Sequence, residues 1–194
     1  TYIQDTWRFS SKGEHTFFTL NYGIRFSHWN FNKESIISPR ISLGIVPAFN
    51  HDVTMRFATG IYYQAPFYKE LRDTTTINGI TYATLNNKIK SQRSIHFIAG
   101  FDYRFKMKDR PYKFTAEAYY KALSNLVPYT VDNVKIVYDA SQQCSGHAMG
   151  LDLKLYGEFV PGTDSWVSLS LMNTRINING KSIPPVSYTH LTLP

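Results

Sequence analysis

Histidine, cysteine and acidic side chains are the groups in this chain from which catalysis or metal binding could be built. None has the required spacing, because the sequence contains no G-x-S-x-G, H-E-x-x-H or C-x-x-C motif and no phosphate-binding glycine loop. His96 and Asp102 share one face of an expected strand, but six residues at about 3.3 Å each hold them too far apart for paired catalysis. Cys144 is the single cysteine, with no His or Asp pattern around it. We therefore predict no catalytic residue, no metal ligand and no cofactor, and we expect that the chain is not an enzyme.

The segment from Gly60 to Arg72 is the one stretch with the composition of a binding surface. It mixes aromatic rings with charged side chains where a strand runs into a long loop. Aromatic residues form girdles at membrane interfaces, which is the interpretation we favour. Aromatic residues and arginine are also enriched in binding surfaces, so a ligand-contacting rim stays open as a second, overlapping interpretation. The candidate rim residues are Tyr62, Gln64, Phe67, Tyr68 and Arg72.

Strands must position these residues, because alternation with period two runs through the chain. Phe18, Leu20, Tyr22, Ile24 and Phe26, for example, alternate with polar or small residues. The same pattern returns in the segments 41–45, 53–63, 95–105, 112–120, 149–159 and 167–171, and residues 1–9 have the pattern of a strand end. The fold class predicted is all-β, an antiparallel up-and-down sheet of about eight strands without a convincing helix.

The connections between these strands alternate in length. Short turns are expected at 10–15, 47–52, 106–111 and 160–164, whereas 65–91 and 123–147 are long loops. Short turns at one end and long loops at the other are typical of outer-membrane barrels, whose turns face the periplasm. Several strands also reach the roughly nine to eleven residues that a membrane barrel requires. A soluble barrel with its apolar face inward remains the alternative, since alternation alone does not distinguish the two.

Composition excludes several other classes. Hydrophobic residues make up 43% of the 194 residues, which is too apolar for a disordered chain, and aromatic residues reach 15%. No apolar run approaches the roughly 18–20 residues of a membrane helix. The net charge is +7, and the lysine and arginine residues are scattered over turns and alternate strand positions. We therefore expect a solvated basic surface and no nucleic-acid partner. Residues 1–9 contain no signal peptide, and an exported protein would need an N-terminus that precedes them.

The order of motifs resembles a known family. Ser38-Pro39-Arg40, then a strand, a short turn, a second strand and the segment YYQAPFY at 62–68, is similar to the middle of TonB-dependent receptor barrels. Such barrels commonly place S-P-R before a descending strand and Y-x-x-P after the next ascending one. The polar stretch 90–94 and the strands at 112–120 and 150–159 also resemble the family, and the similarity extends to about Pro184.

This resemblance implies a multi-pass β-barrel in the outer membrane of a Gram-negative bacterium. Its partners would be outer-membrane lipid, a small nutrient ligand and the TonB complex, which acts through an N-terminal part not present here. The family barrel has about twenty-two strands, so residues 1–184 are expected to be a partial barrel, lacking the plug and the remaining strands. We expect an open curved sheet.

The implied function is energised import of a scarce nutrient: an iron chelate, a vitamin, an oligosaccharide or a peptide. The alternative is a passive porin or a structural or adhesive outer-membrane barrel. An outer-membrane enzyme would require catalytic side chains that this stretch does not contain.

The last ten residues, 185–194, are expected to be foreign to the protein. The sequence from Val186 to Pro194 is what a common transposase sequencing adapter encodes in one reading frame, and a preceding C supplies Pro185. We therefore exclude this segment from the fold prediction.

Overall fold

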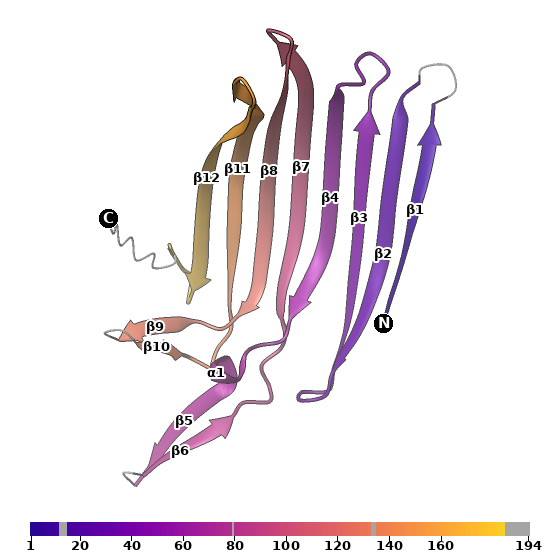
Figure 1. Cartoon of the computed structure of the whole chain (residues 1–194). Helices are drawn as coiled ribbons and strands as arrows, with labels where there is room; N and C mark the ends of the chain where they lie inside the picture. The colour runs from indigo at the N-terminus through magenta and orange to yellow at the C-terminus, as the bar shows by residue number, and fades with distance from the viewer. Residues whose placement is uncertain (12–14, 79, 133–134, 185–194) are drawn as a thin grey trace.

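In this computed structural model, which describes residues 1–11, 15–78, 80–132 and 135–184, the chain is an antiparallel β-sheet (Figure 1). The main sheet contains nine strands in the order β1-β2-β3-β4-β7-β8-β11-β12-β13. Its strands are β1 (Tyr2–Ser10), β2 (Phe17–Trp29), β3 (Glu34–Val46), β4 (Val53–Gln64), β7 (Gln92–Met107), β8 (Arg110–Leu126), β11 (Cys144–Val160), β12 (Thr163–Ile178) and β13 (Lys181–Ile183).

Eight of these strands are long and β13 has three residues, which confirms the prediction of about eight strands. The two ends of the sheet, β1 and β13, are not paired with each other, so the sheet is open as expected. Cys144, expected in a loop, is instead the first residue of β11, because β8 and β11 continue further toward the loops than the alternation indicated. Residues 185–194 lie outside the described residues, and their foreign origin stays a prediction.

The register joins the alternating patterns of separate strands into two continuous faces. Every long strand pairs with its neighbour so that apolar positions lie opposite apolar positions. One row across the apolar face is Trp7, Leu20, Leu43, Phe57, Ala99, Ala118, Leu151 and Leu171. The next row on the opposite, polar face is Thr19, Gly44, Arg56, Gly100, Glu117, Asp152 and Ser170. A slip of one residue in any strand would exchange its two faces, so the register is strongly specified.

Short turns gather at one end of the sheet, which we name the turn end, and long excursions at the other, the loop end (Figure 1). At the turn end, Lys108 and Asp109 both have positive φ between the paired residues Met107 and Arg110, so they form a two-residue hairpin turn. The loop end carries α1 (Tyr68–Leu71) and two hairpins, β5 (Arg72–Ile77) with β6 (Ile80–Leu85) and β9 (Tyr129–Asp132) with β10 (Lys135–Tyr138).

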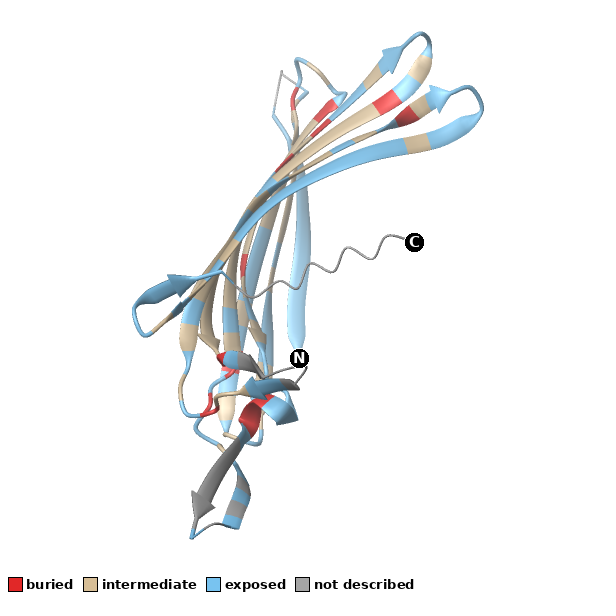
Figure 2. Cartoon of the chain, turned by 90° about the vertical axis from the view of Figure 1, so that its left-hand side faces the viewer, coloured by how far each residue is buried: buried red, intermediate tan, exposed pale blue. Residues whose placement is uncertain are grey.

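Burial is sparse over the sheet and concentrated near its two ends (Figure 2). The apolar face keeps large side chains half-exposed, among them Phe57, Phe97 and Leu171. A single sheet with this much exposed apolar surface needs a further apolar environment on that face.

Within the described residues, no helix is both long and apolar enough to cross a membrane.

Candidate functional site at the loop end

The loop end contains the hydrophobic core of the described chain. Leu71, Ile89, Val127 and Ala140 are buried together, and Trp29 packs against them along with Tyr138. These residues come from the two long loops and, in the case of Trp29, from the last position of β2. Loops rarely bury residues of their own, so this core gives the loop end a fixed base.

Side chains bonded to the backbone hold the same loops together. Asn32 donates through Nδ2 to the carbonyl oxygen of Ile89 at 3.1 Å. Asn86 donates in the same way to the carbonyl oxygen of Ala140 at 2.8 Å, which ties the two long loops directly. Buried backbone groups outside a sheet need hydrogen-bond partners. The side-chain amides of Asn32 and Asn86 therefore stabilise loop backbone that makes no strand-to-strand hydrogen bonds.

Two carboxylates fix the places where the loops leave the sheet. Glu70 is buried and accepts from the backbone N–H of Phe67 at 2.8 Å and from Nε2 of Gln92 at 3.1 Å. Glu34 accepts from the backbone N–H of Ser91 at 2.9 Å. Neither role was predicted from the sequence. Glu70, three residues after Phe67 at a helix start, has the spacing of a helix cap, and that signal could have found it.

The five predicted rim residues lie on three connected elements. Tyr62 and Gln64 are exposed on the polar face at the end of β4. Phe67 and Tyr68, at 64% and 67% exposure, lie at the start of α1, and Arg72 is exposed at the start of β5. The structure brings Tyr62 onto the ring of His96, with centroids 4.4 Å apart, and not onto the rings of Phe67 or Tyr68.

A cleft opens in the polar face where β3 and β4 separate. Their pairing ends at Arg40 and Gly60, although β2 and β3 stay paired to Glu34 and β4 and β7 stay paired to Gln64. Pro39, next to the last paired residue, has no N–H to extend that ladder. In Figure 1 the lower end of β4 turns toward β7 while β3 continues beside β2. The β3–β4 cleft has a volume of about 290 Å³. It is lined by the polar-face residues Arg25, Ser27, Trp29, Ile36, Ser38, Arg40 and Tyr62, by His28, Ile61 and Tyr63 from the other face, and by Ala65.

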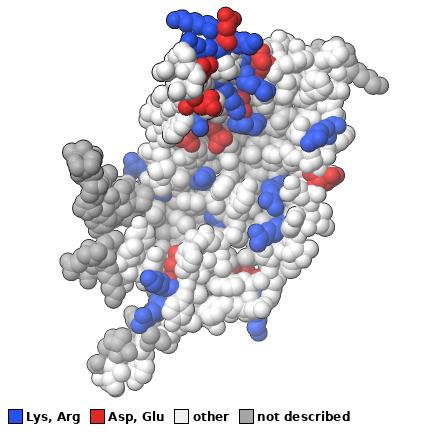
Figure 3. All heavy atoms as spheres, viewed as in Figure 1, with Lys and Arg blue, Asp and Glu red and all other residues white. Residues whose placement is uncertain are grey.

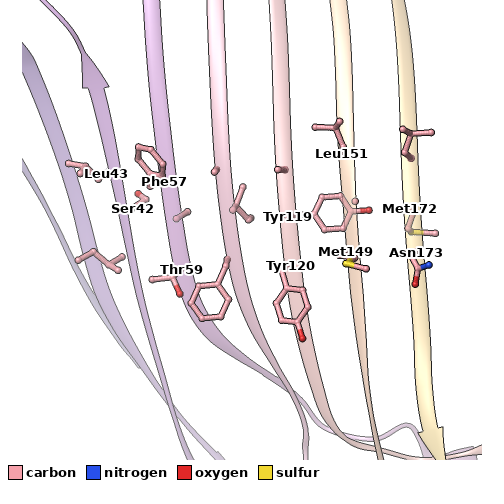
Figure 4. Close-up of a pocket in the computed structure, with 18 of the residues that line it drawn as sticks. Ser42, Leu43, Phe57, Thr59, Tyr119, Tyr120, Met149, Leu151, Met172 and Asn173 are labelled. Carbon is pink, nitrogen blue, oxygen red and sulfur yellow. The ribbon is translucent and has the colours of Figure 1, made fainter. Parts of the chain in front are cut away.

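A larger hollow, of about 1000 Å³, lies on the apolar face in the middle of the sheet. It forms where the small residues Ala99 and Ala118 are flanked by larger neighbours. Figure 4 shows three of these larger side chains, Phe57, Tyr120 and Leu151. Ligand sites usually combine an apolar wall with a few convergent polar groups. No charged side chain lines this hollow, so its surface suits acyl chains better than a specific ligand.

At the turn end, one buried carboxylate is paired with two basic side chains. The buried carboxylate of Asp102 lies 2.6 Å from Nη1 of Arg56 and 3.6 Å from Nζ of Lys113. The hydroxyl of Thr115 donates to the same carboxylate at 2.8 Å. Basic and acidic side chains gather together at this end (Figure 3). The described residues contain no group of three or more His, Cys, Asp or Glu that could hold a metal ion.

Asp139 is a carboxylate of the loop end whose pKa is shifted by its hydrogen bonds. Asp139, in the link between β10 and β11, accepts hydrogen bonds from the hydroxyl and the N–H of Ser141 and from Nε2 of Gln142. The hydroxyl of Ser141 is the largest influence and lowers the pKa of Asp139; partial burial opposes it, and the other two donors lower the pKa further.

A meander of long antiparallel strands, with one apolar face, one polar face, turns at one end and packed loops at the other, defines the wall of an outer-membrane type of β-barrel. The family model "TonB dependent receptor-like, beta-barrel" matches residues 1–193, and the chain belongs to this family. This match confirms the resemblance found in the motifs. Members of the family are transporters of the Gram-negative outer membrane. No curated protein and no solved structure matches the chain.

Proposed function

We propose that this chain forms part of the wall of a transporter that imports a scarce nutrient through the outer membrane. The observation that carries the proposal is the loop end, where exposed aromatic and basic side chains stand on a buried core. A rim held by packed loops is suited to contact a ligand, because binding to ordered side chains costs less entropy. Tyr62, Gln64, Phe67, Tyr68 and Arg72 are the proposed ligand-facing residues.

The apolar face would contact lipid and the polar face would line the barrel interior. The half-exposed row through Phe57 and Leu171 supports this orientation, since exposed apolar surface of that extent is costly in water. The edges at β1 and β13 would pair with further strands of the same barrel, because open strand edges are not tolerated in lipid. The TonB complex is the proposed energising partner on family membership alone.

Conductance of the full-length protein, inserted in planar lipid bilayers, tests import against passive diffusion. A gated transporter should show little steady conductance, whereas a passive porin should conduct in proportion to voltage. In parallel, deletion of the gene should produce a nutrient-limited growth defect that inactivation of TonB reproduces. Steady ohmic conductance together with growth that is insensitive to TonB would support the porin alternative instead.

Labelling of single cysteines in intact cells tests the orientation. Asn78 lies at the tip of the β5–β6 hairpin and Asn50 lies in the turn between β3 and β4, at opposite ends of the sheet. In the full-length protein, N78C should react with a membrane-impermeant maleimide and N50C should not. The opposite result would place the long loops in the periplasm.

A further inference from the structure

We propose that the β3–β4 cleft binds an anionic group, a carboxylate, phosphate or sulfate, carried by a ligand with a flat apolar body. The proposal rests on the proposed transport function in one respect: the ligand of the cleft is taken to be the imported nutrient. The binding site itself follows from the separation of the two strands and from the side chains that line it.

Two guanidinium groups supply the charge. Arg25 from β2 and Arg40 from β3 both line the cleft. Among the described residues the salt bridges all involve Asp102 at the turn end, so neither arginine of the cleft has a carboxylate within 4.0 Å. A guanidinium presents a planar fork of N–H donors that matches the oxygens of a carboxylate or phosphate. Two such forks beside the hydroxyls of Ser27 and Ser38 form a donor set suited to an oxyanion.

The charge distribution along the polar face favours an anion at this end. In the strand rows beyond Asn21 toward the loops, the basic side chains are Arg25, Arg40 and Lys121. On the same face, Glu117 and Asp152 lie in the rows nearer the turns. Glu34, in the last row of β3 at the loop end, accepts the backbone N–H of Ser91. Arg25 and Arg40 therefore lie between these carboxylates without an ion pair to any of them, and an anion that reaches the cleft meets unpaired positive charge.

Aromatic rings supply the apolar wall. The ring of Tyr62 forms one side of the cleft and is held by His96 behind it. Trp29 lines another side and also packs against the buried loop core, so the cleft is anchored to the fixed base of the loops. Flat rings next to arginine suit a ligand whose anionic group is attached to an aromatic or planar body.

Gly60 makes room for this arrangement. A Cβ at this position would lie 3.1 Å from Cβ of Arg40, 3.1 Å from Cε2 of Tyr62 and 3.2 Å from the carbonyl oxygen of Pro39. Any side chain here would displace both Arg40 and Tyr62. Gly60→Ala therefore changes the shape of the cleft without changing its charge.

Calorimetric titration of the full-length protein in detergent micelles tests the proposal. The probes are benzoate, its neutral counterpart benzamide, and inorganic phosphate. Benzoate should bind at least tenfold more tightly than benzamide, and its affinity should fall about tenfold or more in the double variant R25Q/R40Q. Phosphate titration distinguishes a compact oxyanion from an aromatic carboxylate as the preferred ligand. Gly60→Ala should also weaken benzoate binding.

Arg104→Gln is the matched control, since Arg104 is an exposed arginine on the same face at the turn end. This variant should keep the wild-type affinity. The single variants R25Q and R40Q, checked for heat-modifiable migration, replace the double variant if it does not fold. Equal binding of benzoate and benzamide, or unchanged affinity in the folded arginine variants, overturns the site and leaves energised import untouched. Anion binding that depends on the two arginines in a protein that conducts passively keeps the site and removes the import proposal.

Discussion

The two ends of the sheet satisfy their polar groups in different ways. At the turn end, Asp102 is neutralised by Arg56 and Lys113 on neighbouring strands. At the loop end, the carboxylates of Glu34 and Glu70 accept backbone N–H groups instead, and the arginines of the β3–β4 cleft have no acidic partner among the described residues.

This difference shows how one continuous sheet can combine two tasks. Ion pairs between strands compensate the charges of Asp102, Arg56 and Lys113 locally and leave these three groups unavailable to a ligand. Carboxylates bonded to backbone order the loops without using any basic side chain. The loop end therefore keeps both a fixed backbone and free positive charge, which is the combination that a binding surface requires.

Removal of core volume at the loop end should have the largest effect. Leu71→Ala empties part of the buried core and should cost about 2–5 kcal/mol of local stability. Trypsin cleavage at Arg72 in the full-length protein on intact cells should become at least tenfold faster, because cleavage follows the open population. Ile80→Ala, at an exposed position on the adjacent hairpin, should leave the rate unchanged. Equal acceleration by both variants would show that the core does not hold the loops.

A charged side chain placed midway between the two ends should destabilise the protein more on the apolar face than on the polar face. Phe57→Arg on the apolar face should cost about 2–4 kcal/mol in the refolded full-length protein, because the charge would enter lipid. The neighbouring change Ala58→Arg, on the polar face, should cost less. Urea unfolding in lipid vesicles measures both. The lipid-facing assignment is wrong if the two variants lose the same free energy.

Loss of the central carboxylate at the turn end should have an intermediate effect. Asp102→Asn leaves Arg56 and Lys113 without their partner and should cost about 1–2 kcal/mol, less than a fully buried pair because both cations are 45% exposed. Asp109→Asn, in the hairpin turn, removes a carboxylate with no ion pair and keeps a residue that accepts positive φ. A similar loss in both variants of the full-length protein would contradict a role for the ion pairs.

Acidification should destabilise the segment around Asp139, between β10 and β11. This is the smallest of the expected effects. The pKa of this carboxyl is lowered below its ordinary 3.8, so its stabilising contribution is complete above that value and is lost as the pH falls through the lower folded value. Amide hydrogen exchange at Ser141, corrected for the intrinsic pH dependence, should accelerate in that window. Asp139→Asn should remove the pH dependence, and a persistent dependence in this variant would assign it to another group.

Much of the fold follows from the sequence, because each strand carries its own alternation. Leu20, Leu43 and Phe57 lie in one row as the patterns predict, since a meander aligns each strand with the one before it. Strand ends were less predictable. β8 and β11 continue into the expected loop at 123–147, where the residues no longer alternate and cross-strand pairing decides.

The candidate site was predicted only in part. The composition of the segment 60–72 indicates a binding surface, and the ligand-facing role of its residues stays a prediction. Asn32 and Asn86 were missed because their partners are backbone carbonyl groups distant in sequence, which leave no local pattern. Glu70 has a local partner in the N–H of Phe67, but its contact with Gln92 is likewise distant in sequence. The cleft was missed for a related reason: Arg25 and Arg40 meet only because β2 and β3 pair, and the space beside them depends on where β4 leaves β3.

The unbroken neighbour-to-neighbour pairing of the long strands has a consequence for assembly. Each strand of the main sheet bonds only to the strands before and after it in that order, so no segment has to wait for a distant part of the chain. The contact order is therefore low within each hairpin, and it rises only where the long excursions separate β4 from β7 and β8 from β11. The sheet can grow by addition of one hairpin at a time, with the two excursions as the slow loop-closure steps.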